Sequence, residues 1–103
     1  MVINQSLLNQ LTEQAKAFLR IHRHQHTSET VVCRRGRVVE EFYDKLKRIC
    51  TDSIELTPNG PNVAVNVPAG RWHSIRAVVS GSVVLAVKDG KYEPISDADI
   101  LKL

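Results

Sequence analysis

Short segments with strand character alternate with turn signals along most of this chain, and that alternation limits the fold more than any other feature of the sequence. Glycine, proline, asparagine and aspartate favour tight turns, and they recur at Gly36 and in the runs 57–61, 68–70, 80–81 and 89–90. Several short strands with regularly spaced turns predict an all-β sandwich or barrel. The predicted strands span residues 17–24, 29–34, 38–43, 49–56, 62–67, 73–79 and 82–88, with a hairpin loop at 44–47.

The two ends of the chain carry helical patterns instead. Apolar residues recur at helical spacing across residues 4–16, which predicts an N-terminal helix. Ser96 and Asp99 stand at the spacing of a capping box, with aspartate in place of glutamate, and predict a short C-terminal helix. We therefore expect one domain over residues 1–103, with a helical segment at 1–16, a β-barrel at 17–92 and a tail at 93–103.

Composition excludes several classes of protein. A formal net charge of +3 and an aromatic content of 5% do not fit a nucleic-acid-binding surface, which needs dense basic stripes with interleaved aromatic residues. The apolar runs are too short for a membrane span, and the N-terminus lacks the pattern of a signal peptide. Cys33 and Cys50 have no CxxC spacing and fit reduced thiols. These features favour a cytoplasmic protein.

A candidate metal site stands out in the sequence. His22 and His24 point to the same face if their segment is extended, because side chains alternate along a strand. Glu29 opens the next predicted strand, and His73 follows the turn at 68–70. We interpret these four residues as ligands that converge on one divalent metal; polar surface histidines are the alternative. Imidazole and carboxylate ligands suit Mn, Fe, Co, Ni, Cu or Zn, whereas Mg and Ca prefer oxygen alone.

Arg20 is the candidate substrate-binding residue. It shares the predicted face of His22, and a guanidinium group suits a carboxylate or phosphate. The alternative is an arginine at the end of the barrel with its head group in solvent. His26 falls where the chain must bend toward Glu29, which favours a position at the rim over a role as a further ligand.

Other side chains have two readings each. Cys33 shares the predicted face of Glu29 and can either approach the metal or pack as a small hydrophobic residue. Trp72 points away from its neighbour His73 along a strand, which favours packing or an interface over a stacking platform. Tyr43 and Tyr92 are possible acids or bases that nothing in the sequence places at the site.

The spacing of these residues resembles the two motifs of the cupins. The segment 22–36, with its histidines, glutamate and glycine, resembles the first motif, and the segment 68–73 resembles the second. More narrowly, the stretches 28–30, 54–58, 68–73 and 87–92 resemble the WbuC family of cupin-fold metalloproteins. The resemblance covers about residues 17–90. It implies a jelly-roll β-barrel with a metal inside, held by His22, His24, Glu29 and His73, and it implies a homodimer.

The sequence contains no nucleophile elbow, phosphate loop or dinucleotide fingerprint, so functional expectations rest on the metal. The first is a metalloenzyme that acts on a small polar molecule, such as a sugar or a sugar-derived acid. The second is a non-catalytic module that binds or senses a small ligand. The third is a subunit whose surface serves a partner, which a large exposed apolar patch would favour. Several polar groups around the metal would favour the enzyme, and a mostly apolar interior would favour ligand binding.

Overall fold

The structure is a computed structural model that describes residues 2–3, 19–46, 48–91 and 93–101. Its strands are β1 (Val2–Ile3), β2 (Glu29–Arg35), β3 (Val38–Asp44), β4 (Ile49–Leu56), β5 (Ala64–Val67), β6 (His73–Ala77) and β7 (Ser82–Lys88). They form two antiparallel sheets, with strand orders β1-β7-β2-β5 and β4-β3-β6. The prediction of an all-β fold is therefore confirmed for the described residues.

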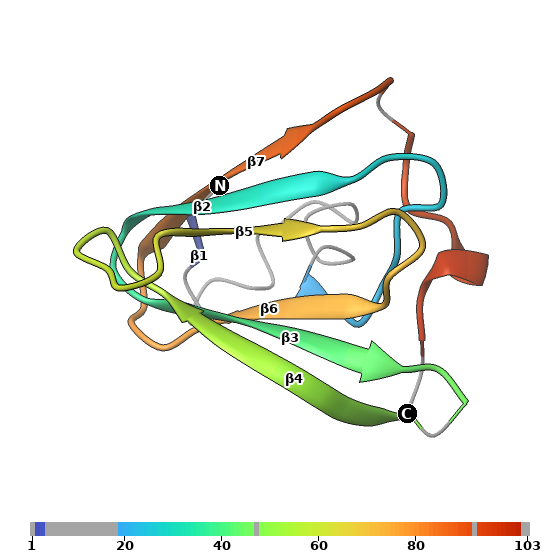
Figure 1. Ribbon diagram of the computed structural model, residues 1–103, viewed down its shortest axis with the longest axis horizontal. Coiled ribbons are helices and arrows are strands. Elements are labelled where there is room, and N and C mark those ends of the chain that lie inside the picture. The colour runs from blue at the N-terminus through green and yellow to red at the C-terminus, as the bar shows by residue number, and fades with distance from the viewer. Residues whose placement is uncertain (1, 4–18, 47, 92, 102–103) are drawn as a thin grey trace.

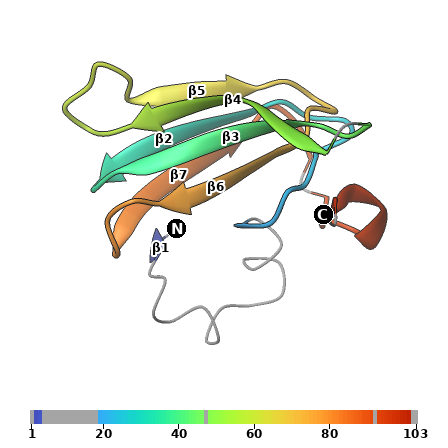
Figure 2. The same ribbon diagram turned by 90° about the horizontal axis from the view of Figure 1, so that it is seen from below.

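The two sheets face each other across one hydrophobic core (Figures 1 and 2). Val31 and Val84 come from the β7–β2 side, and Val38, Leu56 and Ile75 come from the β4-β3-β6 sheet. Each of these side chains is at most 3% exposed. Complete burial of one such side chain stabilises the fold by about 1.5–3 kcal/mol relative to exposure, so this cluster holds the two layers together.

The interior changes from apolar to polar along the strands. Buried and half-buried side chains alternate along β2, so Glu29, Val31 and Cys33 face inward. Val31 and Cys33 belong to the core, whereas Glu29 stands at the opposite end of the strand. On β3, Glu40 follows the core residue Val38 at the same two-residue interval. One end of the interior is therefore hydrophobic, and the other collects polar side chains.

Most predicted strands are present, and their bounds shift by two residues or fewer. The prediction at 17–24 is wrong where the structure describes it. Leu19 has a helical conformation, Arg20 and the next residue form a bend, and His22 makes only isolated bridges. The alternation that suggested a strand has another cause. Leu19 packs against the core, while His22 and His24 are buried next to β6.

The helices predicted at the two ends of the chain have different outcomes. The predicted helix at 4–16 lies outside the described residues, whereas Val2–Ile3, which we included in the helical segment, pair with β7. In place of a C-terminal helix there is one 3-10 turn, η2 (Asp97–Asp99). Ser96 donates its hydroxyl to the carboxylate of Asp99 at 3.1 Å and does not cap a backbone N–H. The turn ends at Ile100, which is extended and bridges to the backbone of His22. No helix in the described ranges has the length and hydrophobicity that a bilayer span requires.

The predicted turns at Gly36 and at 44–47 are confirmed, by different means. Gly36 has a φ of 82°, and a Cβ at this position would lie 2.2 Å from Oγ of Ser82. Glycine alone tolerates both conditions. The second loop contains no glycine, so Arg48 adopts the positive φ, at 55°, and its N–H donates to the carbonyl of Asp44 at 2.6 Å.

Candidate metal centre

His22 and His73 are held side by side by their backbones. The N–H of each residue donates to the carbonyl of the other, at 2.8 Å in both directions. His73 is the first residue of β6, and His22 pairs with it as an isolated antiparallel bridge. Residues that face each other across such a pair present their side chains on the same face. Both imidazoles are accordingly buried in the interior, at 0% and 1% exposure.

The turn before β6 places His24. The N–H of Gly70 donates to the carbonyl of His24 at 2.7 Å, and Gly70 has a φ of 80°. The predicted turn at 68–70 therefore does more than reverse the chain. It binds the segment that carries the first two histidines to the strand that carries the third.

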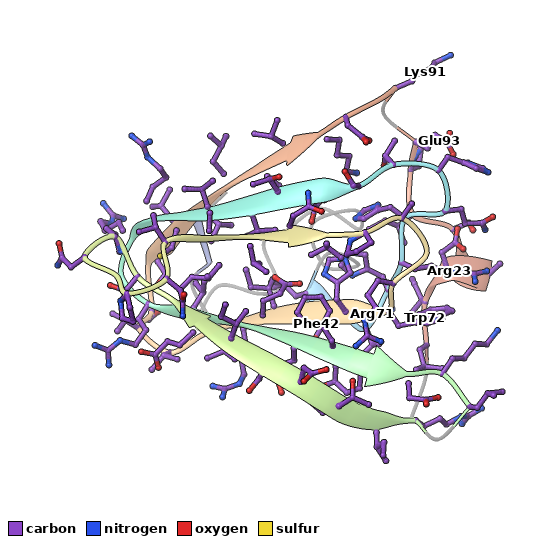
Figure 3. The ribbon with its side chains drawn as sticks, viewed as in Figure 1. Arg23, Phe42, Arg71, Trp72, Lys91 and Glu93 are labelled. Atoms are coloured by element: carbon purple, nitrogen blue, oxygen red, sulfur yellow. The ribbon has the colours of Figure 1, made fainter. Side chains whose placement is uncertain are left out.

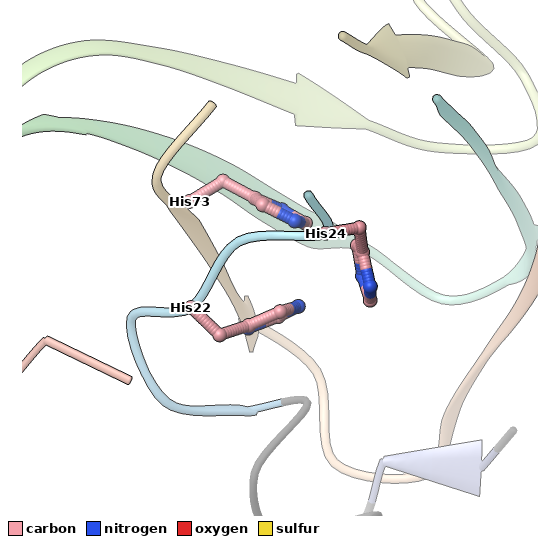
Figure 4. Close-up of side chains that lie close together, drawn as sticks. All are labelled: His22, His24 and His73. Atoms are coloured by element: carbon pink, nitrogen blue, oxygen red, sulfur yellow. The ribbon is translucent and has the colours of Figure 1, made fainter. Parts of the chain in front are cut away.

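The three imidazoles converge on one another (Figure 4). The ring of His22 lies with its centroid 4.3 Å from that of His73 and 4.9 Å from that of His24, and the remaining pair is 5.7 Å apart. One ligand nitrogen from each ring can be chosen so that all three lie within 4.8 Å of one another. Nitrogens bound about 2.0–2.1 Å from a shared ion lie roughly 3–3.5 Å apart. A short movement of the rings would therefore bring the three nitrogens to metal-binding distance.

In two of the three rings, an oxygen atom lies within hydrogen-bond distance of Nδ1. The Nδ1 of His22 lies 2.7 Å from the carbonyl oxygen of Arg20, and the Nδ1 of His73 forms a hydrogen bond with Oε1 of Glu40. A proton retained on Nδ1 leaves the lone pair of Nε2 for a metal. The Nε2 of His73 is buried and has no hydrogen-bond partner in the described part of the chain.

Glu29 approaches the histidines from the other sheet. It is 0% exposed, and its Oε2 lies 3.3 Å from the Nε2 of His24. In the β2–β7 ladder it stands opposite Lys88, so the two side chains share a face. Glu29 is not among the residues whose ligand atoms lie within 4.8 Å of one another. The structure thus brings three of the four predicted ligands together and places the fourth beside His24.

Burial keeps the imidazoles of His22 and His73 neutral. It is the main cause that lowers the pKa of His22 from 6.5 to about 3 and the pKa of His73 from 6.5 to about 4. Neutral imidazole is the form that binds metals. Burial also raises the pKa of Glu40 from 4.5 to about 9. For Glu29, burial acts in the same direction, but the contact with His24 and the charge interactions with His24, His73 and Lys88 together outweigh it and leave the pKa below 4.5.

The donor set fits a divalent transition metal. Neutral imidazoles and a carboxylate are the ligands that such ions take in proteins. The Nε2 of His73 and the Oε1 of Glu29 are both buried without a hydrogen-bond partner among the described residues, and burial of polar atoms in this state costs free energy. A cation among these side chains would satisfy both atoms.

Arg20 contributes its backbone, and not its side chain, to this cluster. The side chain is exposed and lines a surface groove with Glu41, Tyr43 and Arg76. Glu41 and Arg76 form an ion pair at 3.0 Å on the outer face of the β3–β6 pair, on the side away from the imidazoles. Because the chain bends at Arg20 and does not continue as a strand, the guanidinium group is not brought to the histidines. Tyr92, the other tyrosine considered, lies outside the described residues.

The remaining residues of interest lie apart from the cluster. His26 is exposed, and its Nδ1 is 3.1 Å from a carboxylate oxygen of Glu93. Cys33 is 1% exposed and packs in the hydrophobic core. The ring of Trp72 is buried beneath the guanidinium group of Arg23, 4.8 Å away, at the end of the fold next to η2 (Figure 3). These positions support the packing and rim roles over direct roles in metal binding.

Sequence reasoning missed two titratable residues near the site. Glu40 was foreseeable, because strict alternation from Val38 turns it inward. Lys88 was not foreseeable, because its closeness to Glu29 depends on the register between β2 and β7.

The described residues thus form a buried group of three histidines that can hold a metal ion, flanked by the carboxylate of Glu29 and the carboxyl group of Glu40. The group stands at the polar end of the interior, opposite the hydrophobic core. Comparisons of the chain with protein-family models, with curated proteins and with solved structures found no match.

Proposed function

We propose that this protein binds one divalent transition metal through His22, His24, His73 and Glu29. The observation that carries the proposal is the burial of three imidazoles whose ligand nitrogens lie within 4.8 Å of one another. For Glu29 to serve as the fourth ligand, its carboxylate would move from its contact with His24 onto the ion. The ion is one of Mn, Fe, Co, Ni, Cu or Zn, because the donor set mixes nitrogen with oxygen.

The proposal extends to the class of fold. We assign the chain to the cupin-type jelly rolls, as a metalloprotein similar to the WbuC family. Support comes from two facing antiparallel sheets and from the origin of the ligands. Two histidines precede β2, Glu29 opens β2 and His73 opens β6, in the order of the two cupin motifs that the sequence resembles.

We favour a metalloenzyme that acts on a small polar molecule, such as a sugar or a sugar-derived acid. The metal would supply Lewis acidity. Glu40 and Lys88 support this choice, because they add polar groups to the interior next to the proposed ligands. The alternative, a non-catalytic module that binds or senses a ligand, is favoured by the position of Arg20. The side chain expected to orient a substrate lies on the outer groove.

We also propose that the protein is a homodimer in the cytoplasm. Leu85 and Val87 are 50% and 52% exposed on the outer face of β7, and Leu85 stands opposite Val32 of β2. A second copy would cover these apolar side chains. Both cysteines are free, as is usual in the cytoplasm. Sedimentation of the Leu85→Lys variant tests the dimer, because a charge on this face should release monomers.

A calorimetric titration tests metal binding. Chelator-treated protein titrated with Zn²⁺ should bind one equivalent. The His73→Ala variant should bind more than about 100-fold more weakly, since even loss of an outer-shell partner costs about 10- to 100-fold. His26→Ala is the matched control, because His26 is exposed and lies outside the cluster. Equal affinity in the wild type and in His73→Ala would overturn the proposal.

A further inference from the structure

Glu40 has a buried carboxyl group to which metal binding by the four proposed ligands gives no role. It is 0% exposed and faces the interior from β3. In the β3–β6 ladder, Phe42 stands opposite His73 and Glu40 stands opposite Ile75. Glu40 and His73 are therefore diagonal neighbours on one face of the sheet, a separation that long side chains span.

Glu40 uses that reach to contact the ring of His73 on the side away from the proposed metal. Its Oε1 forms a hydrogen bond with Nδ1 of His73. We infer that Glu40 is a positioning residue, which holds the His73 ring with its proton on Nδ1 and its Nε2 directed at the metal. The inference rests on the proposed metal binding.

The chemistry of imidazole supports this role. A neutral imidazole carries one proton, so a metal on Nε2 leaves that proton on Nδ1. An acceptor at Nδ1 then fixes the orientation of the ring and raises the basicity of the ligating nitrogen. His22 obtains the same contact from the backbone carbonyl of Arg20, at 2.7 Å. His73 obtains it from a side chain, so its contact can be removed by substitution.

Packing alone does not account for a carboxyl group at this position. Glu40 stands between Ile54 of β4 and Ile75 of β6 in the sheet, where an apolar side chain of similar size would fit. Its second oxygen, Oε2, is buried and forms no hydrogen bond with the described residues. Burial of a carboxyl group in such surroundings costs free energy. The hydrogen bond to His73 accounts for the presence of a residue whose burial is unfavourable.

Two substitutions at Glu40 and one control test the inference. Glu40→Met removes the acceptor and keeps the bulk, whereas Glu40→Gln retains an oxygen that can accept from Nδ1. Glu41→Gln is the matched control, because Glu41 contacts Arg76 on the outer face. We expect Glu40→Met to weaken Zn²⁺ binding by about 10- to 100-fold. Glu40→Gln should recover most of that loss, and Glu41→Gln should bind as the wild type does.

A spectroscopic measurement separates positioning from a merely structural effect. In the Zn²⁺-loaded wild type, proton and ¹⁵N NMR should show a slowly exchanging, downfield proton on Nδ1 of His73. Glu40→Met should lose this signal, and Glu40→Gln should keep it at a shifted frequency. If Glu40→Met does not fold, the wild type and Glu40→Gln still decide the question, because absence of this signal from the wild type overturns the inference.

The outcomes distinguish the two proposals. Zn²⁺ binding by the wild type with unchanged affinity in Glu40→Met would overturn the role of Glu40 and leave the metal site standing. Failure of the wild type to bind Zn²⁺ would overturn both. Weakened binding in Glu40→Met with recovery in Glu40→Gln is the result that the inference expects.

Discussion

His22 and His73 exchange both of their backbone hydrogen bonds, each at 2.8 Å, and the same two residues supply two of the three clustered imidazoles. The separation of these rings is therefore set by β-pairing and not by a loop. Because the pairing uses main-chain atoms alone, it does not depend on the side chains. Alanine variants at these positions should keep the local fold, so a loss of metal in them would report the site itself.

Substitution of Glu29 by glutamine tests the fourth ligand. A neutral amide is a weaker metal ligand than a carboxylate, so Glu29→Gln should lower Zn²⁺ affinity by at least about tenfold, as loss of an outer-shell partner already does. Glu55→Gln is the control, because the carboxylate of Glu55 is about half exposed, at 52%, on β4. Unchanged affinity in Glu29→Gln, measured by calorimetry, would restrict the site to the histidines.

The stability of the metal-free protein should depend on pH with a maximum near pH 6.5. Burial lowers the pKa of His22 to about 3 and that of His73 to about 4, both from 6.5. Below pH 6.5 the unfolded chain therefore binds more protons at these residues than the folded chain, and acid favours unfolding. The stability that depends on their neutral state is complete above pH 6.5 and is lost as the pH falls toward about 4 and 3.

Glu40 has the opposite effect on the pH dependence of stability. Burial raises its pKa from 4.5 to about 9, so its contribution is complete below pH 4.5 and is lost as the pH rises toward 9. Between 4.5 and 6.5 two histidines oppose one carboxyl group, and stability still rises with pH. Urea unfolding across this range measures the profile. In Glu40→Gln the decline above pH 6.5 should disappear; a wild-type profile that rises through pH 8 would contradict this assignment.

Two glycines with the same backbone conformation should respond differently to alanine. Gly36 and Gly81 have φ angles of 82° and 83°. An added Cβ at Gly36 would meet Oγ of Ser82 at 2.2 Å, whereas nothing lies within 4 Å at Gly81. Gly81→Ala should cost about 1–2 kcal/mol for the left-handed backbone. Gly36→Ala should cost about 1–3 kcal/mol more because of the clash. Denaturant unfolding compares them, and equal losses would show that Ser82 yields without cost.

Side chains at the hydrophobic end of the interior should contribute to the stability of the fold without directly affecting metal binding. Leu56 is fully buried in the core, and Leu56→Ala should destabilise the protein by about 2–5 kcal/mol. Leu46 is 94% exposed, so Leu46→Ala should change stability by less than about 0.5 kcal/mol. Thermal melting measures both. Where Leu56→Ala remains folded, its stoichiometry of Zn²⁺ should match that of the wild type, and a loss of binding would show that the two ends of the interior are coupled.

The strands could be predicted because their signals are local. Turn residues and β-branched side chains mark Ile49–Leu56 and Ser82–Lys88, and both predicted ranges agree with the observed ones. The three histidines could also be recognised as candidates, because the HxH pair and a histidine shortly after the 68–70 turn are local patterns too.

The remaining features depend on contacts between distant segments. The backbone at His22 pairs with His73 on one side and with Ile100 on the other, and this arrangement goes with a bend at Arg20 that no local pattern signals. The bend carries the side chain of Arg20 away from the imidazoles. Likewise, the hydrogen bond between Glu40 and His73 depends on the register of β3 against β6. A single sequence contains no direct information about either relationship.

Elemental analysis of the purified, untagged protein tests the central claim most directly. The wild type and the His26→Ala control should each contain close to one equivalent of a transition metal, natively or after loading and dialysis. The double variant His22→Ala, His73→Ala should contain only traces of metal, although its circular dichroism spectrum should remain that of a β-protein. Equal metal content in the wild type and the double variant would contradict the account, because the clustered histidines would then not be the ligands.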